Sequence, residues 1–468
     1  MKLSVERLRE ALGDIIDETG FLVGPEIGDR YCIDWIGSRG SPIAVVRPRT
    51  PAEVAAVIRI LHDLGQPVVP QGGMTGLVGA SVPQKGEVVI SLERLTRIES
   101  IDHLSATVTV EAGAILQNVQ MAIEPHGLYF PVDLGARGSA TIGGMISTNA
   151  GGNRVLRYGM TRQSILGLEI VLPNGTIISR MRGLIKDNAG YDLKHLFIGT
   201  EGTLGVVTRA VLQLQPKPAS IDTALVGVNR FDDVLFLLKS CRAALGPSLT
   251  SFEVMWDNYF SFVTEHLGLV RSPLNRRYAF YVLIENSTFG THSGREELET
   301  ALEKYQSMNT DDEVVIAQSL KDAESWWRIR DSVGEAARSV APFAGFDISL
   351  PLVQMGEWVS NIEIELSKYN VRNLHIYGHL GDGNLHLVVG CDPAKPNMKN
   401  EIYALVHKSA ADAGGSISAE HGIGFTKKAH LSFDRSKDEI NLMKEIKHLL
   451  DPGNLLSPGR IIDIGGKL

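Results

Sequence analysis

Three glycine-rich loops in the first half of the chain constrain its fold more than any other feature. They span residues 71–76, 138–144 and 199–205, and the first directly follows the short strand-like run 67–70. Successive backbone N–H groups in such loops form a concave nest that binds an anion, and glycine lets the backbone approach a ligand closely. One such loop is as consistent with an ordinary turn as with a binding site. Three of them in one domain indicate a large cofactor that carries phosphate.

The loops do not match the two most familiar phosphate-binding motifs. The chain contains no G-x-x-x-x-G-K-[ST], the motif of NTPase P-loops. No G-x-G-x-x-G opens a strand–turn–helix unit either, which argues against an ordinary dinucleotide-binding site of the Rossmann type.

Length, charge and composition indicate a globular protein of two or three domains. The 468 residues are 44% hydrophobic, and the formal net charge of -8 argues against a general nucleic-acid-binding protein. No apolar run reaches the length of a transmembrane segment. The N-terminal stretch lacks the apolar core of a signal peptide and has too many acids for a transit peptide. Cys32, Cys241 and Cys391 have no paired spacing, which fits a reducing compartment, and we expect a cytoplasmic location.

Alternating strand and helix signals divide the chain into three parts. Residues 1–216 carry short strands and helices, and one helix is expected after Thr50, with Pro51 at its first position and Glu53 completing a capping box. From 217 to 425 the order strand–helix–strand–strand–helix–strand occurs and then recurs. This order predicts an antiparallel sheet with helices on one face, an α+β arrangement. Residues 426–468 form a helical segment that we expect to pack back on the first part.

A predicted hairpin carries two histidines. Strand-like runs flank Asp382-Gly383, a pair typical of a two-residue type I′ turn. A hairpin centred there places His379 opposite His386, with Cβ atoms roughly 4.5–5.5 Å apart. Both imidazoles could then bind one metal ion, with Glu420 as a third ligand. This ligand set suits Zn2+, with Mn2+ or Fe2+ as alternatives; the other interpretation is a surface hairpin with two solvated histidines.

Several long motifs, in the right order, resemble those of a known family. They are RPRTPAEVAAVI, PQGGMTGLVGASVP, TIGGMISTNAGG, DNAGYDLKHLFIGTEGTLGVVT, YGHLGDGNLH and ISAEHGIG. Together they resemble the FAD-linked oxidases of the vanillyl-alcohol-oxidase fold, and in particular the group of D-2-hydroxy-acid dehydrogenases. The resemblance implies a PCMH-type FAD-binding domain and a cap or substrate domain with an antiparallel sheet covered by helices.

The resemblance also implies which segments bind FAD. Residues 70–81 would hold the pyrophosphate, residues 138–152 would run towards the isoalloxazine ring, and residues 201–206 would hold the adenosine end. The residues concerned are Pro70, Gln71, Gly72, Gly73, Met74, Thr75, Gly76, Leu77, Ser81, Pro131, Asp133, Gly138, Thr141, Gly143, Gly144, Ser147, Asn149, Gly151, Gly152, Glu201, Gly202, Gly205 and Val206. Met74 and Ser457 stand where these dehydrogenases usually carry Asn. The first loop holds no histidine that could link the flavin, so we expect non-covalent FAD.

The expected reaction is oxidation of a small D-2-hydroxy acid to the 2-oxo acid, with a hydride passing to flavin N5. His421 is the expected base, because the ordinary histidine pKa of about 6.5 suits proton removal near neutrality. A metal ion would bind the substrate oxygens and lower the pKa of the hydroxyl. By resemblance, Arg330 would bind the substrate carboxylate through a bidentate fork. Asn384 would hydrogen-bond the substrate or the flavin. The alternative for Arg330 is an arginine in a surface ion pair, and the alternative for Asn384 is an ordinary turn residue.

Two glycines leave the substrate unspecified. Relatives that use dicarboxylates tend to carry Thr at the position of Gly334 and Lys at the position of Gly345. Without these side chains a second carboxylate would lose a hydroxyl donor and a cation.

Two other functions remain open on the sequence alone. A metallohydrolase could use His379, His386 and Glu420 with a bound water, but the glycine loops would then have no function. A flavin-carrying subunit of a larger glycolate-oxidase-type complex is the second. The electron acceptor stays open between oxygen, a quinone and an electron-transfer flavoprotein, and a homodimer is compatible with such enzymes.

Overall fold

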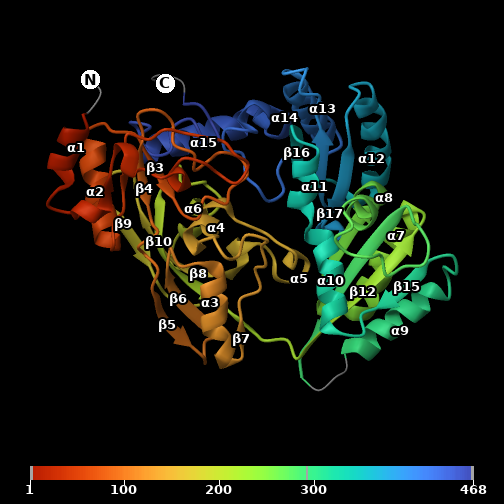
Figure 1. Cartoon of the computed structure of the whole chain (residues 1–468). Coiled ribbons are helices and arrows are strands. Elements are labelled where there is room, and N and C mark those ends of the chain that lie inside the picture. The colour runs from red at the N-terminus through yellow and green to blue at the C-terminus, as the bar shows by residue number, and fades with distance from the viewer. Residues whose placement is uncertain (1–3, 291–293, 465–468) are drawn as a thin grey trace. The chain divides into compact units, whose positions relative to one another are not determined.

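The computed structural model describes residues 4–290 and 294–464 of the chain, which form two compact units (Figure 1). Unit 1 consists of the residues up to Gly152, of Gly159–Lys217 and of the residues from Glu420 onwards. Unit 2 consists of Asn153–Tyr158 and Pro218–Ala419. The sequence signals place parts at 1–216, 217–425 and 426–468. They do not reveal that the short segment 153–158 belongs to unit 2, or that the chain returns to unit 1 directly after Ala419.

The described residues of unit 1 form two β-sheets and a two-stranded ribbon. Its strands are β1 (Phe21–Leu22), β2 (Ala44–Val46), β3 (Val68–Gln71), β4 (Val88–Ser91), β5 (Ile98–Asp102), β6 (Thr107–Glu111), β7 (Leu128–Tyr129), β8 (Ile165–Val171), β9 (Ile177–Arg180), β10 (Val206–Gln213) and β11 (Gln215–Pro216). The first sheet has the order β1-β2-β4-β3, with parallel pairing except between β1 and β2. The second is antiparallel, in the order β5-β6-β10-β8-β9, and β7 pairs with β11.

The helices of unit 1 include one that begins where the local sequence predicts. They are α1 (Val5–Leu12), α2 (Pro51–Asp63), α3 (Leu116–Ile123), α4 (Ile142–Thr148), α6 (Lys194–Phe197), α14 (Leu431–Asp434) and α15 (Lys437–Leu450). Thr50 caps α2, since its Oγ1 accepts a hydrogen bond from the backbone N–H of Glu53 at 3.1 Å. Helix α2 is the crossover between β2 and β3, which run parallel on either side of β4.

The C-terminal segment of unit 1 pairs with the strand that leads into the first glycine loop. The backbone N–H of Val68 donates to Leu455 O at 2.8 Å, and that of Ser457 donates to Val68 O at 2.7 Å. The buried ammonium of Lys447 on α15 donates to Asp451 and to the carbonyls of Thr203 and Leu456. Residues 447–457 therefore help to fix two of the three glycine loops.

Unit 2 is built on one antiparallel sheet. Its strands are β12 (Ser220–Val228), β13 (Leu249–Trp256), β14 (Phe280–Thr288), β15 (Glu313–Ile316), β16 (Phe343–Ser349), β17 (Leu374–Gly378) and β18 (Asn384–Gly390). The strand order is β15-β12-β14-β13-β17-β18-β16, and every pair is antiparallel. The recurring order of elements in the sequence thus appears as two similar halves that meet where β13 pairs with β17.

Helices cover both faces of this sheet, so the expectation of helices on one face is wrong. The helices of unit 2 are α5 (Val155–Tyr158), α7 (Phe231–Leu245), α8 (Asp257–Ser261), α9 (Gly294–Gln306), α10 (Leu320–Asp331), α11 (Val333–Ser339), α12 (Leu352–Ser367) and α13 (Met398–Asp412). Val254 and Val282 pack with α7, α9, α12 and α13 on one face. Their neighbours Met255 and Leu283 pack with α8, α10 and α11 on the other. Because successive strand residues face opposite sides, both faces are apolar and need cover.

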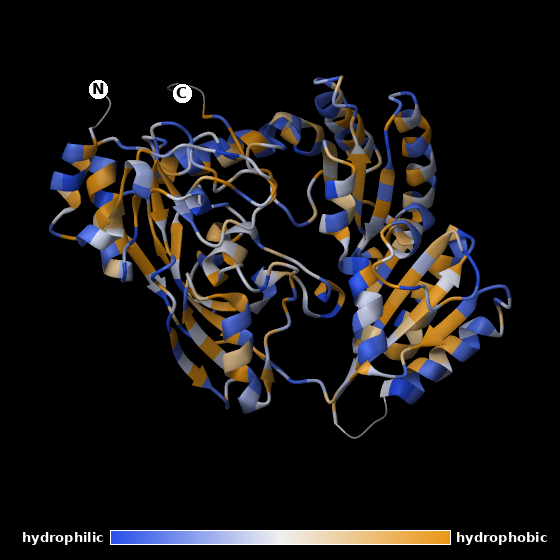
Figure 2. Cartoon of the chain, viewed as in Figure 1, coloured by the Kyte–Doolittle hydropathy of each residue, from blue (hydrophilic) through white to orange (hydrophobic). Residues whose placement is uncertain are grey.

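Figure 2 shows that the strands of both units are mainly apolar, whereas the helices carry polar residues on part of their surface. Among the described residues, the two apolar clusters of unit 1 and the two of unit 2 follow this pattern. No helix among the described residues combines the length and the apolar character needed to cross a bilayer.

Candidate active site

The first two glycine loops pack directly against each other in unit 1. A Cβ added to Gly73 would lie 1.9 Å from the carbonyl oxygen of Ser139, and one added to Gly72 would lie 2.3 Å from Oγ1 of Thr141. Any side chain at these positions would push the loops apart. Glycine is therefore required at Gly72 and Gly73 because the two loops approach each other closely. The backbones of the two loops are in direct contact there.

One glycine of the first loop faces open space instead. No described atom lies within 4 Å of a Cβ added to Gly76. Met74, two residues before it, has a φ of 55°, in the left-handed region that few side chains favour. A left-handed residue in a glycine-rich loop beside open space fits the concave backbone nest that binds an anion, and the residues present fit a phosphate-bearing cofactor.

The third glycine loop joins the other two. A Cβ at Gly202 would lie 2.7 Å from the ring of Pro70, and the backbone N–H of Glu201 donates to Ser147 O at 2.7 Å. The Glu201 carboxylate accepts hydrogen bonds from the backbone N–H groups of Ile423 (2.7 Å) and Gly424 (2.8 Å). Burial raises the pKa of Glu201 to about 7. Its side chain thus holds the loop that follows His421.

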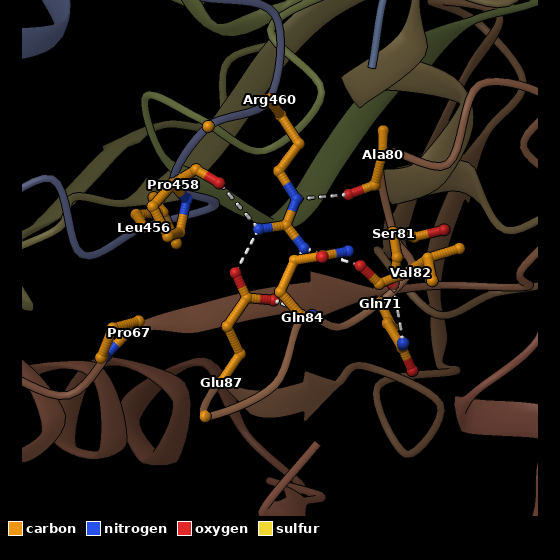
Figure 3. A network of polar contacts seen from close by, with 12 residues as sticks. Pro67, Gln71, Ala80, Ser81, Val82, Gln84, Glu87, Leu456, Pro458 and Arg460 are labelled. Carbon is orange, nitrogen blue, oxygen red and sulfur yellow. Dashed lines mark hydrogen bonds and ion pairs between the residues drawn. The ribbon is translucent and has the colours of Figure 1, made fainter. Parts of the chain in front are cut away.

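Arg460 fixes the far end of the first loop (Figure 3). Its Nε donates to Ala80 O at 3.0 Å, its Nη2 donates to Val82 O at 2.8 Å, and both Nη atoms contact the Glu87 carboxylate. The Gln71 amide donates to Ser81 O at 2.9 Å, which closes the same loop from its start. Arg460 is not evident from the sequence, because Glu87 and the carbonyls of Ala80 and Val82 lie 373 to 380 residues away along the chain.

In unit 2 a polar cluster lies on the sheet face that α10 covers. Glu253 on β13 points to the same side as Met255, while Tyr377 and His386 lie opposite each other on β17 and β18. Asp347 on β16 lies opposite His386 on its other side. These polar side chains share one face because directly paired residues point to the same side of a sheet.

The hairpin that carries the two histidines does not have the expected register. His386 lies opposite Tyr377, and residues Leu380–Asp382 form a one-turn 3-10 helix before Gly383, whose φ is 83°. The two-residue turn is therefore wrong, because the connection between the strands is longer. The rings of His379 and His386 still lie close together, with centroids 5.4 Å apart and planes at 81°.

Arg330 and His379 share a buried carboxylate, that of Glu253. Arg330 Nε donates to Glu253 Oε2 at 2.7 Å, and His379 Nδ1 lies 2.9 Å from Oε1. Burial is the largest influence on Arg330 and disfavours its charged form, but the charge of Glu253 and the weaker contributions of other nearby groups together raise the pKa of the guanidinium. Burial would raise the pKa of Glu253, but His379 and Arg330 together hold it below its ordinary value. Arg330 is thus no surface arginine, and its Nε is not available for a bidentate fork to a ligand.

His386 also has a carboxylate neighbour. Its Nδ1 lies 4.0 Å from Oδ1 of Asp347, a residue fully buried in the sheet. Asp347 in turn anchors the end of unit 2, since Ala419 N–H donates to its carbonyl at 3.3 Å and Ser418 Oγ donates to its carboxylate at 3.4 Å. Neither Glu253 nor Asp347 belongs to a local motif, so sequence reasoning missed both.

Asn384, at the start of β18, stands out by what it does not contact. Its side chain is 3% exposed, and neither amide atom has a hydrogen-bond partner among residues 4–290 and 294–464. A buried amide without partners costs free energy. It therefore fits a residue kept for a ligand better than the alternative of a turn residue.

The remaining expected site residues lie in unit 1. Glu420 Oε1 accepts a hydrogen bond from the backbone N–H of Gly152 at 2.9 Å. His421 follows directly and precedes the loop that Glu201 holds. All of the expected FAD-binding residues, from Pro70 to Val206, also belong to unit 1.

Comparison with known families agrees with this architecture. Residues 42–180 match the family described as "FAD binding domain", and residues 217–461 match "FAD linked oxidases, C-terminal domain". Among solved structures, p-cresol methylhydroxylase has a TM-score of 0.77 at 16% identity, over 99% of this chain and 97% of that one. Alkyldihydroxyacetonephosphate synthase has a TM-score of 0.74 at 15% identity, over 97% and 84%. At this identity the likeness shows the fold, that of a PCMH-type FAD-dependent oxidase.

Curated relatives define the family more closely. The chain is 38% identical over 442 residues to the mitochondrial D-2-hydroxyglutarate dehydrogenase of Bos taurus, covering 94% of this chain and 81% of that protein. It is 38% identical over 450 residues to the Arabidopsis thaliana enzyme of the same name, covering 96% and 80%. A putative mitochondrial D-lactate dehydrogenase of Schizosaccharomyces pombe is 34% identical over 461 residues, covering 96% and 88%. The chain belongs to the FAD-linked oxidase family, in the group that contains these dehydrogenases, and is an FAD-dependent oxidoreductase.

The names of these relatives overturn the expected cytoplasmic location, because the bovine, plant and yeast proteins are all named as mitochondrial. A low cysteine count does not distinguish the cytosol from another reducing compartment, which is why composition gave the wrong answer.

Proposed function

We propose that this protein oxidises a D-2-hydroxy acid to the 2-oxo acid. The observation that carries the proposal is the polar cluster of unit 2. There, two histidines with carboxylate neighbours and a buried arginine lie on one sheet face of an FAD-linked oxidase. The relatives named D-2-hydroxyglutarate and D-lactate dehydrogenases support this reaction class. A hydrolase would leave the three packed glycine loops without a function.

FAD would be held by the glycine loops of unit 1, from Pro70 to Ser81, from Gly138 to Gly152 and from Glu201 to Val206. When bound, FAD supplies the acceptor for the hydride. The loops would contribute backbone N–H groups near Gly76, where the described chain leaves open space. Without a histidine in the first loop, the cofactor would be bound non-covalently.

A divalent metal ion would be held by His379, His386 and Glu420. Metal-binding histidines commonly donate their second ring N–H to a carboxylate, and Glu253 and Asp347 are placed next to these two rings. Glu420 is joined by one peptide bond to Ala419, whose N–H is held by Asp347, the residue opposite His386. Zn2+, Mn2+ and Fe2+ all accept such ligands. A bound ion would supply Lewis acidity, which lowers the pKa of the substrate hydroxyl.

The protein's own residues would bind the substrate and take its proton. His421 would accept the hydroxyl proton. Arg330 would bind the carboxylate through Nη1, because Nε is bonded to Glu253 and Nη2 lies 3.2 Å from His379 Nε2. Asn384 would donate from its unpartnered amide to the substrate or the flavin.

The substrate is left as a D-2-hydroxy acid. Gly345 lies opposite Val388 on β18, on the same sheet face as Asp347, and the nearest described atoms to an added Cβ belong to the Phe343 ring at 3.5 Å. A lysine there would reach towards the polar cluster, and this chain lacks it. A Saccharomyces cerevisiae relative at 36% identity is named D-2-hydroxyglutarate–pyruvate transhydrogenase. A 2-oxo acid therefore joins a quinone, an electron-transfer flavoprotein and oxygen as a proposed electron acceptor.

Two substitutions test the assignment of roles. His421→Ala should keep FAD and metal but lower turnover by about 10²–10⁴-fold, the usual contribution of a general base. His386→Ala should lose the metal, measured by elemental analysis of the purified protein. The exposed His103→Ala, in unit 1, serves as the matched control and should change neither value. Near-normal turnover of His421→Ala, or unchanged metal content of His386→Ala, would contradict the respective role.

A further inference from the structure

Glu253 takes no part in the chemistry proposed above, yet it contacts two of the residues that do. Its side chain on β13 is 1% exposed. One oxygen accepts from Arg330 Nε at 2.7 Å, and both oxygens lie within 2.9 Å of His379 Nδ1. Within the described part of the chain, both partners of this carboxylate are therefore proposed site residues.

The contact with Glu253 determines which nitrogen of His379 can bind a metal. An ionised carboxylate only accepts hydrogen bonds, so the Nδ1 atom that faces it carries the proton. The lone pair of the ring is then on Nε2. A metal ion needs that lone pair, and the carboxylate both fixes the tautomer and holds the plane of the ring.

The same carboxylate determines how Arg330 is presented. Nε is held by Glu253, Nη2 lies 3.2 Å from His379 Nε2, and the guanidinium carbon lies 5.0 Å from the centre of the Tyr377 ring. Within residues 4–290 and 294–464, Nη1 is the guanidinium nitrogen that makes no hydrogen bond. Binding of a metal at His379 Nε2 and donation from Nη2 to that atom exclude each other. When a metal ion binds His379 Nε2, the hydrogen bond from Nη2 to that atom is lost, and the hydrogen bond to Glu253 keeps the guanidinium in place.

We infer that Glu253 is a positioning residue that serves metal binding by His379 and carboxylate binding by Arg330 at the same time. The inference rests on the proposed function. An amide at this position would have one acceptor for two donors. Either Arg330 would lose its partner, or the amide N–H would turn His379 to the tautomer with a proton on Nε2, which leaves no lone pair on that nitrogen for a metal.

Three variants of the FAD-loaded full-length protein test this role. Glu253→Gln should weaken Zn2+ binding by about 10–100-fold, measured by competition with a chromogenic chelator. It should also raise the KM for D-lactate or D-2-hydroxyglutarate, whichever the wild type oxidises, while the flavin spectrum stays unchanged. Glu253→Asp keeps both acceptors and should recover part of the Zn2+ affinity. The control is Glu285→Gln on the adjacent strand β14. This substitution removes another buried carboxylate, which is paired with Arg154 at 2.9 Å, and it should leave Zn2+ binding at the wild-type value.

The outcomes separate the inference from the function on which it rests. A folded Glu253→Gln protein with wild-type Zn2+ affinity and wild-type KM overturns the inference. If Glu253→Gln does not fold, Glu253→Asp is the deciding variant, because its carboxylate is one methylene further from Arg330 and His379. Wild-type Zn2+ affinity and wild-type KM in Glu253→Asp would then overturn the inference. A wild-type protein that binds no divalent metal overturns the proposed metal site instead, and the KM of Glu253→Gln then still tests the hold on Arg330.

Discussion

Asn384 is the residue whose surroundings most clearly separate function from stability. Its buried amide makes no hydrogen bond within the described chain, so folding removes it from water without compensation. A residue that costs stability in this way is kept where a ligand uses it.

Asn384→Ala should therefore reduce activity without reducing stability. We expect kcat/KM to fall roughly 10- to 100-fold if the amide bonds a charged group, while the free energy of unfolding stays constant or rises by about 1 kcal/mol. Steady-state kinetics and the thermal midpoint of the same preparation check both values. A lower midpoint with normal kinetics would mean that Asn384 is a structural turn residue.

At the residue scale the sequence predicts the chemical groups but not their partners. The histidines and Asn384 lie in motifs long enough to be recognised, and Arg330 is implied by the family resemblance. Glu253 and Asp347 do not, because their importance arises from the pairing of β13 with β17 and of β16 with β18. Long-range register places them beside the histidines, and no short stretch of sequence contains that information.

Among the elements, the glycine loops of unit 1 offer a matched pair of substitutions. Gly73→Ala should destabilise unit 1 by about 1–3 kcal/mol or more, because the new Cβ would overlap the Ser139 carbonyl. Gly76→Ala meets no described atom within 4 Å. It should keep or raise stability by about 0.4–1 kcal/mol while weakening FAD binding. Thermal midpoints of the FAD-free proteins and FAD titrations distinguish the two effects; tight FAD binding by Gly76→Ala would show that the cofactor does not occupy this space.

Arg460 links the C-terminal segment to the first glycine loop. Its guanidinium is buried against Glu87 and two loop carbonyls. Arg460→Gln leaves the Glu87 charge uncompensated, so we expect a loss of about 3–5 kcal/mol of stability and weaker FAD binding. Arg39→Gln, which removes an ion pair with Asp29 between side chains that are 59% and 71% exposed, is the control and should cost about 0–1 kcal/mol. Equal thermal midpoints for the two variants would contradict the proposed role of Arg460.

The histidine hairpin shows where local rules fail for an element. Asp382-Gly383 favours a two-residue turn, but the actual connection is longer because Leu380 is fully buried in the core of unit 2. Arg242 at the end of α7 also donates to Gly381 O at 2.5 Å. Both contacts are tertiary, so turn chemistry alone does not predict the register.

For the whole molecule, the sequence predicts the fold class well because its motifs are long and ordered. The FAD-binding domain, the antiparallel sheet of the second part and the family were all expected and are confirmed. Helices on the second sheet face were not expected, since the amphipathic pattern of α10 and α11 gives no indication of which face they cover. The location was wrong because composition carries too little information about a compartment.

The anaerobic visible spectrum of the FAD-loaded protein tests the central claim most directly. We expect addition of one D-2-hydroxy acid, D-lactate or D-2-hydroxyglutarate among them, to bleach the oxidised flavin, because the hydride passes to the isoalloxazine. The L-enantiomer should leave the spectrum unchanged. A flavin-loaded protein that no D-2-hydroxy acid bleaches would contradict the proposed reaction.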